Sequence, residues 1–261
     1  MYNLRHLDLF SGIGGFSLAA QWLGGIETIQ FVEIDPFCQR VLAKNFPGVP
    51  IHGDISTFTH RGGIDLITAG FPCQDISIAG HGAGLDGERS GLFREVVRIV
   101  RECRPRYVIL ENVAALLTSN GGRDMATVLW ELSESGYDAE WEIIPASALG
   151  ANHARGRDWI VAYPNSVGRE ICERKKRGQV SRRRLLSRDS GGQKLCKSDK
   201  RHELLKAPRL GDVPQFPRAN DGFSSRMDRV RALGNSILPQ VAMIPLQRVL
   251  NLNQQSKKCI K

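Results

Sequence analysis

Short apolar runs alternate with amphipathic stretches along the first 163 residues of the chain. The runs are too short for buried helices, and the stretches between them have apolar residues at helical spacing. Predicted strands occupy residues 6–10, 28–33, 64–69, 107–110, 139–144 and 159–162, with a further short one before Asp54. Predicted helices occupy residues 16–23, 37–45, 92–101 and 123–134. This alternation predicts an α/β fold with a doubly wound, mostly parallel sheet of the Rossmann-like kind, whose ligands lie at the carboxyl ends of the strands.

The pattern changes after Pro164. Residues 165–217 have little apolar periodicity, whereas an apolar helix is predicted again near residues 239–250. We therefore expect residues 1–163 to form a catalytic and cofactor-binding domain and residues 164–217 a small basic region. Residues 218–261 are expected to return to the first domain.

The positive charge is concentrated in one segment. The formal net charge is +9, and residues 164–231 contain 19 Lys and Arg against 8 Asp and Glu, so they carry +11 and the remainder −2. A localised positive field suits a polyanion such as nucleic acid, because neutralised phosphates release counterions. A solvated basic linker has the same composition, so charge alone leaves both interpretations open.

Composition narrows the remaining classes. The chain is 41% hydrophobic, and no window approaches the 18 or so consecutive apolar residues of a membrane span. The first residues lead directly into a predicted strand without the apolar region of a secretory signal, so we expect a cytoplasmic protein without membrane contact. The six cysteines form no CxxC pair, which favours a reducing compartment and predicts no metal site.

The loop after the first predicted strand, Asp8 to Gly15, is rich in glycine and precedes a helix. Such loops allow backbone N–H groups to approach a nucleotide-like ligand closely. Glu33 ends the second predicted strand, where an acidic side chain binds ribose hydroxyls, and Asp54 follows the third, where it can accept from an adenine amino group. Together they favour a cofactor that contains adenosine. The alternative is a set of ordinary polar residues at strand ends.

Two further candidates follow neighbouring strands. Cys73 comes directly after the run that ends near Gly70, and Glu111 follows the strand at residues 107–110. A loop cysteine is more often a small buried apolar residue, but a thiolate at this edge is a nucleophile, and a facing glutamate is a proton donor. The glycine-rich stretch between them, residues 74–91, is long enough for a lid over the site.

Three short elements carry a resemblance: Pro72-Cys73-Gln74, Glu111-Asn112-Val113 and Gly234-Asn235-Ser236. In this order the chain resembles the cytosine-5 DNA methyltransferases of the compact bacterial and phage kind, over about residues 6–163 and 218–250. One departure is His153, where the family most often has glutamine.

The resemblance implies a role for each matching residue. S-adenosyl-L-methionine is the implied cofactor, and its implied binding residues are Phe10, Gly12, Gly14, Glu33, Asp54 and Asn235. Cys73 is the implied nucleophile, Glu111, Arg155 and Arg157 hold the target cytosine, and Pro72, Gln74 and Ser77 flank it at the substrate.

The implied reaction explains these residue types. Carbon 5 of cytosine is too weak a nucleophile to take the methyl group unaided, and addition of the Cys73 thiolate to carbon 6 activates it. Protonated Glu111 stabilises the adduct at ring nitrogen 3. The cytosine must be flipped out of the duplex to reach these groups. The basic region then becomes the target recognition module, reading base edges and contacting phosphates.

The resemblance therefore predicts a DNA (cytosine-5-)-methyltransferase, monomeric and acting on double-stranded DNA in a restriction-modification setting. A restriction endonuclease of the same specificity belongs to such a system, without direct contact expected. Three alternatives remain open: a tRNA cytosine-5 methyltransferase, a catalytically silent sequence-specific DNA-binding protein, and a nucleotide-dependent oxidoreductase, which the glycine loop alone supports.

Overall fold

A seven-stranded sheet with helices on both faces forms the described part of the protein. The computed structural model describes residues 3–60, 62–72, 91–151, 155–166 and 236–258. The strands are β1 (Leu4–Leu9), β2 (Ile26–Val32), β3 (Ile51–His52), β4 (Leu66–Gly70), β5 (Tyr107–Val113), β6 (Tyr137–Pro145) and β7 (Gly156–Pro164). The helices are α1 (Gly15–Leu23), α2 (Pro36–Asn45), α3 (Gly91–Cys103), α4 (Arg123–Glu134) and α8 (Pro239–Lys258), with 3-10 turns η3 (Ala114–Leu117), η4 (Ser119–Gly122) and η5 (Ala146–Leu149).

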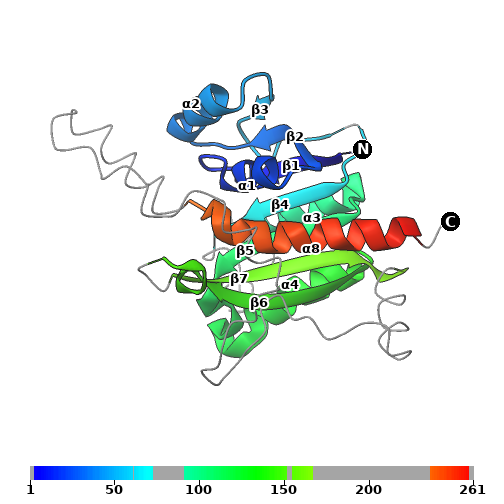
Figure 1. Cartoon of the computed structure of the whole chain (residues 1–261). Helices are drawn as coiled ribbons and strands as arrows, with labels where there is room; N and C mark the ends of the chain where they lie inside the picture. The colour runs from blue at the N-terminus through cyan, green and yellow to red at the C-terminus, as the bar shows by residue number, and fades with distance from the viewer. Residues whose placement is uncertain (1–2, 61, 73–90, 152–154, 167–235, 259–261) are drawn as a thin grey trace, which may run out of the picture.

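The strand order is β3-β2-β1-β4-β5-β7-β6 (Figure 1). The neighbours from β3 to β5 all pair in parallel, whereas β7 is antiparallel to both β5 and β6. The predicted doubly wound, mostly parallel α/β sheet is therefore confirmed. The order reverses between β1 and β4, and a crevice opens outside the carboxyl ends of parallel strands at such a point.

The predicted elements are present with small shifts at their ends. The C-terminal helix is the exception, because it continues eight residues beyond the predicted end at residue 250. The shift that matters for the site concerns the strand at residues 107–110, which continues through Val113. It continues because β7 pairs with it from Val108 to Val113. Glu111 therefore lies within β5 and not after it, and the rigid ladder holds its backbone. The predicted start of α2 is also confirmed: the Asp35 side chain accepts from the N–H of Phe37 at 2.8 Å, and Pro36 opens the helix.

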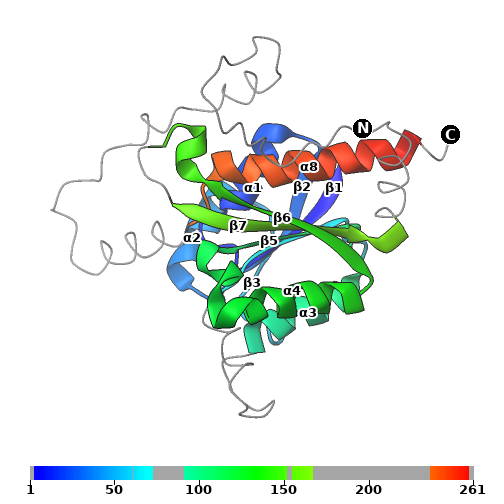
Figure 2. The same ribbon diagram turned by 90° about the horizontal axis from the view of Figure 1, so that it is seen from below.

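The two faces of the sheet bury separate apolar clusters, and Figure 2 shows α8 and α1 on one face and α3 and α4 on the other. On the first face, Phe16 of α1 packs edge-on against Trp159 of β7, with ring centroids 5.7 Å apart. Leu246 of α8 is fully buried in the same cluster. On the second face, Val96 of α3 and Val128 of α4 pack against Leu7 and Leu110 of the sheet. Burial on both faces explains why the central strands are continuous apolar runs.

Candidate active site

The direction of β7 brings the candidate side chains together. Parallel strands β1, β2, β4 and β5 end at one edge of the sheet, and β7, which runs the opposite way, begins there. Arg155 and Arg157 at the beginning of β7 therefore lie beside Glu111 near the end of β5. An alternation of strands and helices does not encode this reversal, so sequence reasoning did not foresee it.

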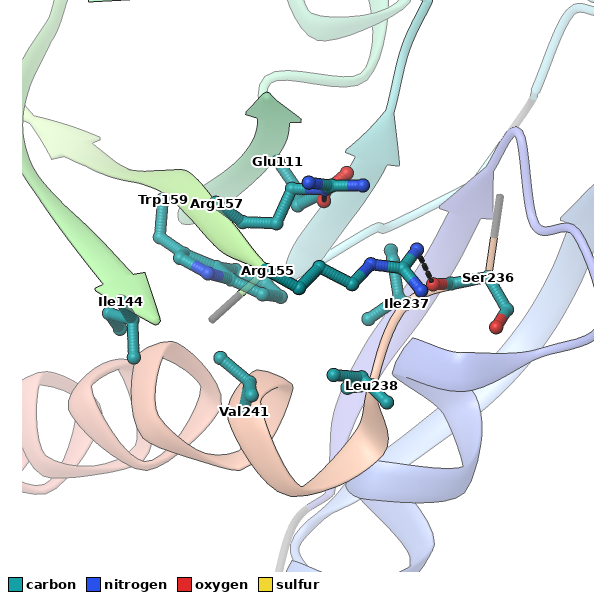
Figure 3. A pocket seen from close by; sticks show the side chains of 9 residues that line it. All are labelled: Glu111, Ile144, Arg155, Arg157, Trp159, Ser236, Ile237, Leu238 and Val241. Carbon is teal, nitrogen blue, oxygen red and sulfur yellow. Dashed lines mark hydrogen bonds and ion pairs between the residues drawn. The ribbon is translucent and has the colours of Figure 1, made fainter. Parts of the chain in front are cut away.

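These three side chains line one pocket, together with Trp159 and the segment before α8 (Figure 3). The Nε of Arg157 lies 2.9 Å from Oε1 of Glu111, in an ion pair with only 24% and 13% of the two side chains exposed. Arg155 donates from Nη2 to the backbone oxygen of Ser236 at 2.7 Å. The pocket is thus built from β5, β7 and the chain that enters α8.

The electrostatics of Glu111 have two opposing causes. Burial raises the pKa of Glu111 because the carboxylate is largely removed from water, while Arg157 and then Arg155 oppose this rise. Burial lowers the pKa of Arg155, and the neighbouring charge of Arg157 adds to that effect. Two guanidinium groups and one carboxyl make the pocket net positive. The pocket therefore suits a ligand whose oxygen atoms accept hydrogen bonds from the two guanidinium groups and whose nitrogen or oxygen accepts a hydrogen bond from protonated Glu111.

The end of β4 lies next to Glu111. Gly70 is the register partner of Glu111, and a Cβ built on Gly70 would lie 3.3 Å from Glu111 Oε2. The backbone oxygen of buried Phe71 accepts from the side chain of Asn112 at 3.1 Å. Pro72 is exposed and is the last described residue before the predicted nucleophile. Cys73, Gln74 and Ser77 lie outside the described residues.

A second set of predicted residues surrounds the glycine loop after β1. Glu33 lies at the end of β2, and its Oε2 accepts from the N–H of Gly12 at 2.7 Å while its Oε1 accepts from the N–H of Asp35 at 2.8 Å. Phe10 has a φ of 52°, which is strained for a residue with a side chain and marks a constrained turn. Each carboxylate oxygen retains accepting capacity, so Glu33 can also accept from ligand hydroxyls.

Close packing makes glycine necessary at the beginning of α1. Gly14 has a φ of +88°, and a Cβ there would lie 2.5 Å from the ring of Phe46. Gly12 has a φ of +53°, with nothing within 4 Å of the position of its Cβ. The backbone at Gly12 is therefore open to a ligand, whereas Gly14 is packed against α2.

The remaining predicted cofactor residues differ in placement. Asp54 is exposed, and hydrogen bonds from the N–H and hydroxyl of Ser56 lower the pKa of its carboxyl. Asn235 lies outside the described residues. Sequence reasoning missed Ile34, an apolar side chain that is 73% exposed between Glu33 and Asp35. Its position directly after a ribose-binding candidate was the available signal.

The described residues contain no group of three or more His, Cys, Asp and Glu side chains able to hold a metal ion. None of the helices described is both long and apolar enough to span a membrane.

The fold and this edge define an α/β protein with a glycine loop after β1 and a Glu–Arg cluster between the end of β5 and the beginning of β7. The family model of the C-5 cytosine-specific DNA methylases matches residues 4–187, and the chain belongs to this family.

Curated relatives agree with this assignment. The chain is 39% identical over 163 residues to the Type II methyltransferase M2.BsuMI of Bacillus subtilis (strain 168), covering 61% of this chain and 42% of the relative. It is 39% identical over 176 residues to the Type II methyltransferase M.HpaII of Haemophilus parainfluenzae, covering 64% and 49%. The chain thus spans less than half the length of these relatives.

Solved structures show the same fold. An E. coli prophage protein described as a putative DNA modification methyltransferase is 28% identical, with a TM-score of 0.53 over 64% of this chain and 48% of that one. The S. pombe Dnmt2 methyltransferase is 18% identical, with a TM-score of 0.62 over 95% of this chain and 99% of that one.

Proposed function

We propose that the protein is a DNA (cytosine-5-)-methyltransferase, which transfers a methyl group from S-adenosyl-L-methionine to a flipped-out cytosine in a short duplex target. The observation that carries this proposal is the cluster of Glu111, Arg155 and Arg157 beside the end of β4. This strand ends at Gly70, three residues before Cys73 in the sequence. Family membership supports the same chemistry.

Glu111 is proposed as the proton donor at ring nitrogen 3 of cytosine. Burial already raises its pKa, and binding of a base displaces further water. The ion pair with Arg157 must then loosen, since the carboxyl has to hold a proton to donate. Arg155 and Arg157 are proposed to bind the ring oxygen or the adjoining phosphates, as bidentate guanidinium donors do.

Cys73 is proposed to form a covalent bond to carbon 6, with Pro72, Gln74 and Ser77 beside the base. The electron pair of the thiolate forms the sulfur–carbon bond, and the ring becomes a nucleophile at carbon 5. Carbon 5 would take the methyl group as the methyl–sulfonium bond breaks and its electron pair stays on sulfur. Water would then accept the carbon 5 proton, the electron pair of that bond would restore the double bond, and the thiolate would leave. Glu111 supplies the proton at nitrogen 3 and recovers it in the last step.

The cofactor pocket is assigned to the glycine loop side. S-adenosyl-L-methionine supplies an activated methyl group when bound. The described residues fit its adenosine: the backbone at Gly12 is open, Glu33 can accept from ribose hydroxyls, and exposed Ile34 offers an apolar surface to a base. We assign the same ligand to Phe10, Gly14, Asp54 and Asn235.

Residues 164–217, with their concentrated positive charge, are proposed as the target recognition region on double-stranded DNA. We further propose that residues 1–163 and 218–261 form the catalytic domain. The protein is proposed to act as a monomer in a restriction-modification system. The α8 helix packs against α1 and β7, which supports the return of the C-terminal segment to that domain.

The test incubates purified protein with unmethylated duplex DNA and tritiated S-adenosyl-L-methionine, followed by bisulfite sequencing. We expect label at carbon 5 of cytosine within one short motif. Cys73→Ser should abolish transfer, whereas Cys103→Ser, a matched change at a partly buried cysteine on α3, should preserve it. A parallel reaction contains tRNA in place of DNA, and label only on the tRNA would favour a tRNA enzyme. Duplex binding without any transfer would favour a silent DNA-binding protein.

A further inference from the structure

Five polar side chains form a closed ring of hydrogen bonds on the α1 side of the sheet, beneath the glycine loop. Four structural elements contribute them: β1, α1, β2 and β4. The members are His6, Asp8, Ser17, Thr28 and Thr68. All but partly buried Thr28 have no exposed surface. None of these residues takes part in the reaction proposed above.

Five contacts close the ring. Oδ1 and Oδ2 of Asp8 lie 2.7 Å from Thr68 Oγ1 and 3.0 Å from Ser17 Oγ. Thr28 Oγ1 lies 3.0 Å from Ser17 Oγ and 2.9 Å from Nδ1 of His6. His6 Nε2 lies 2.7 Å from Thr68 Oγ1, so every member has two ring neighbours.

Counting hydrogens fixes the protonation state of the ring as a whole. Five bonds need five hydrogens, and the three hydroxyl groups supply three. His6 and Asp8 must therefore supply two between them. Either a doubly protonated imidazolium faces a carboxylate, or a neutral imidazole faces a carboxylic acid.

Burial selects the second arrangement, because it contains no charge. Burial lowers the pKa of His6 to about 3. Burial, with a smaller contribution from the nearby Glu33 carboxylate, raises the pKa of Asp8 to about 7, against the opposing effect of the hydrogen bonds from Thr68 and Ser17. Neither α1 nor β4 contains an ionisable residue. The nearest charged residues on β1 and β2 are Arg5 and Glu27, which are register partners one position before His6 and Thr28. On α8, Arg248 forms an ion pair with Glu140 of β6.

The ring is connected to the loop at both of its ends. Asp8 and Ser17 flank residues 9–16, so their hydrogen bond closes the loop that contains Gly12. Glu33, whose carboxylate holds the N–H of Gly12, also interacts electrostatically with Asp8. Loss of the acid proton leaves four hydrogens for five bonds and places a second negative charge beside Glu33.

We propose that the ring is a one-proton clamp that positions the cofactor loop, with Asp8 as a neutral carboxylic acid, and that cofactor binding weakens as this proton is lost. The inference rests on the proposed function, because it takes the glycine loop to be the cofactor site. Asp8 is a positioning residue here and touches no reacting atom.

The test measures the affinity of the full-length protein for S-adenosylhomocysteine by calorimetry between pH 6.5 and pH 8.5. This probe lacks the sulfonium charge, so direct attraction to an ionised Asp8 does not mask the effect. For complete coupling to a group that titrates near pH 7, binding is up to about 25-fold weaker at pH 8.5. We expect at least a threefold loss for the wild type.

The decisive variant is Asp8→Asn, because an amide reproduces the donor and acceptor of the acid without a titrating proton. It should bind within about threefold of wild type at pH 6.5 and show no pH dependence. Asp138→Asn, the same change at an exposed position on β6, should retain the wild-type profile. Thr68→Val should weaken binding at pH 6.5 and Thr68→Ser should restore it, which tests the ring even if Asn at position 8 prevents folding.

Three results would overturn the clamp: a flat wild-type profile, an Asp8→Asn variant with the wild-type profile, or a folded Asp8→Asn variant that does not bind at pH 6.5. Failure of the proposed function gives a different pattern, in which the wild type binds no S-adenosylhomocysteine at any pH. In that case, the protonation of Asp8 can still be measured in the ligand-free protein. The difference in free energy of unfolding between the wild type and Asp8→Asn, measured with urea, should shift in favour of the variant between pH 6 and pH 8.

Discussion

Asp158 offers a quantitative test of the buried electrostatics, since it is a carboxyl with no exposed surface between two strands. It pairs with Asn112 across β5 and with Ile143 across β6, and neither of its oxygens has a hydrogen-bond partner within the described part of the chain. Burial raises its pKa to about 6, and the backbone N–H of Trp159, outside hydrogen-bonding geometry, opposes this rise.

The sign of the pH dependence follows from this shift. Between its ordinary pKa near 3.8 and about 6, the folded protein holds a proton that the unfolded chain releases, so stability falls as pH rises through this window. Over the full shift of the pKa, the free energy of unfolding falls by about 3 kcal/mol between strongly acidic pH and pH 7. About 2 kcal/mol of this fall occurs between pH 4 and pH 8. Replacement of Asp158 by Asn removes the titration.

Urea unfolding of the wild type and Asp158→Asn at pH 4, 5, 6, 7 and 8 measures this effect. The free-energy difference between the two proteins should change by about 2 kcal/mol in favour of the variant as pH rises. Other titrating groups cancel because both proteins contain them. Asp138→Asn, at an exposed position, should give a constant difference. If the free-energy difference between the wild type and Asp158→Asn is also constant from pH 4 to pH 8, burial does not raise the pKa of Asp158 and the reasoning is refuted.

Further predictions concern the loop, the core and the proposed proton donor. Gly14→Ala should lower the free energy of unfolding by about 2 kcal/mol or more, because the new Cβ meets Phe46 and the backbone has a positive φ. Gly12→Ala should lower it by only about 1 kcal/mol, because the positive φ is strained but the Cβ meets no neighbour, and urea unfolding of both variants measures the difference. Leu246→Ala should cost about 2–5 kcal/mol by the same assay, because the fully buried side chain leaves a cavity between α8 and the sheet. Glu111→Gln should reduce the rate of methyl transfer about 100-fold or more with little change in stability, and an unchanged rate would exclude it as the proton donor.

Local patterns were sufficient for the elements and for the family. The apolar runs are buried on both faces of the sheet, so their composition alone marked the strands, and the helix predicted at residues 37–45 is present as α2. The motifs around Glu111 and Arg157 are contiguous in sequence and therefore visible without a structure. The roles proposed for Cys73, Gln74, Ser77 and Asn235 stay predictions, since these residues lie outside the described ones.

Tertiary structure decided what depends on the spatial arrangement of distant segments. The reversal of β7 places Arg157 against Glu111, and pairing with β7 extends β5 through Val113, because strand direction is set by sheet pairing and not by residue type. The ring at Asp8 joins residues up to 62 positions apart, and each of them by itself is an ordinary strand or helix residue. The sequence by itself determined the family and the candidate site residues, whereas packing decided which of the acids are buried, and burial determines where they hold their protons.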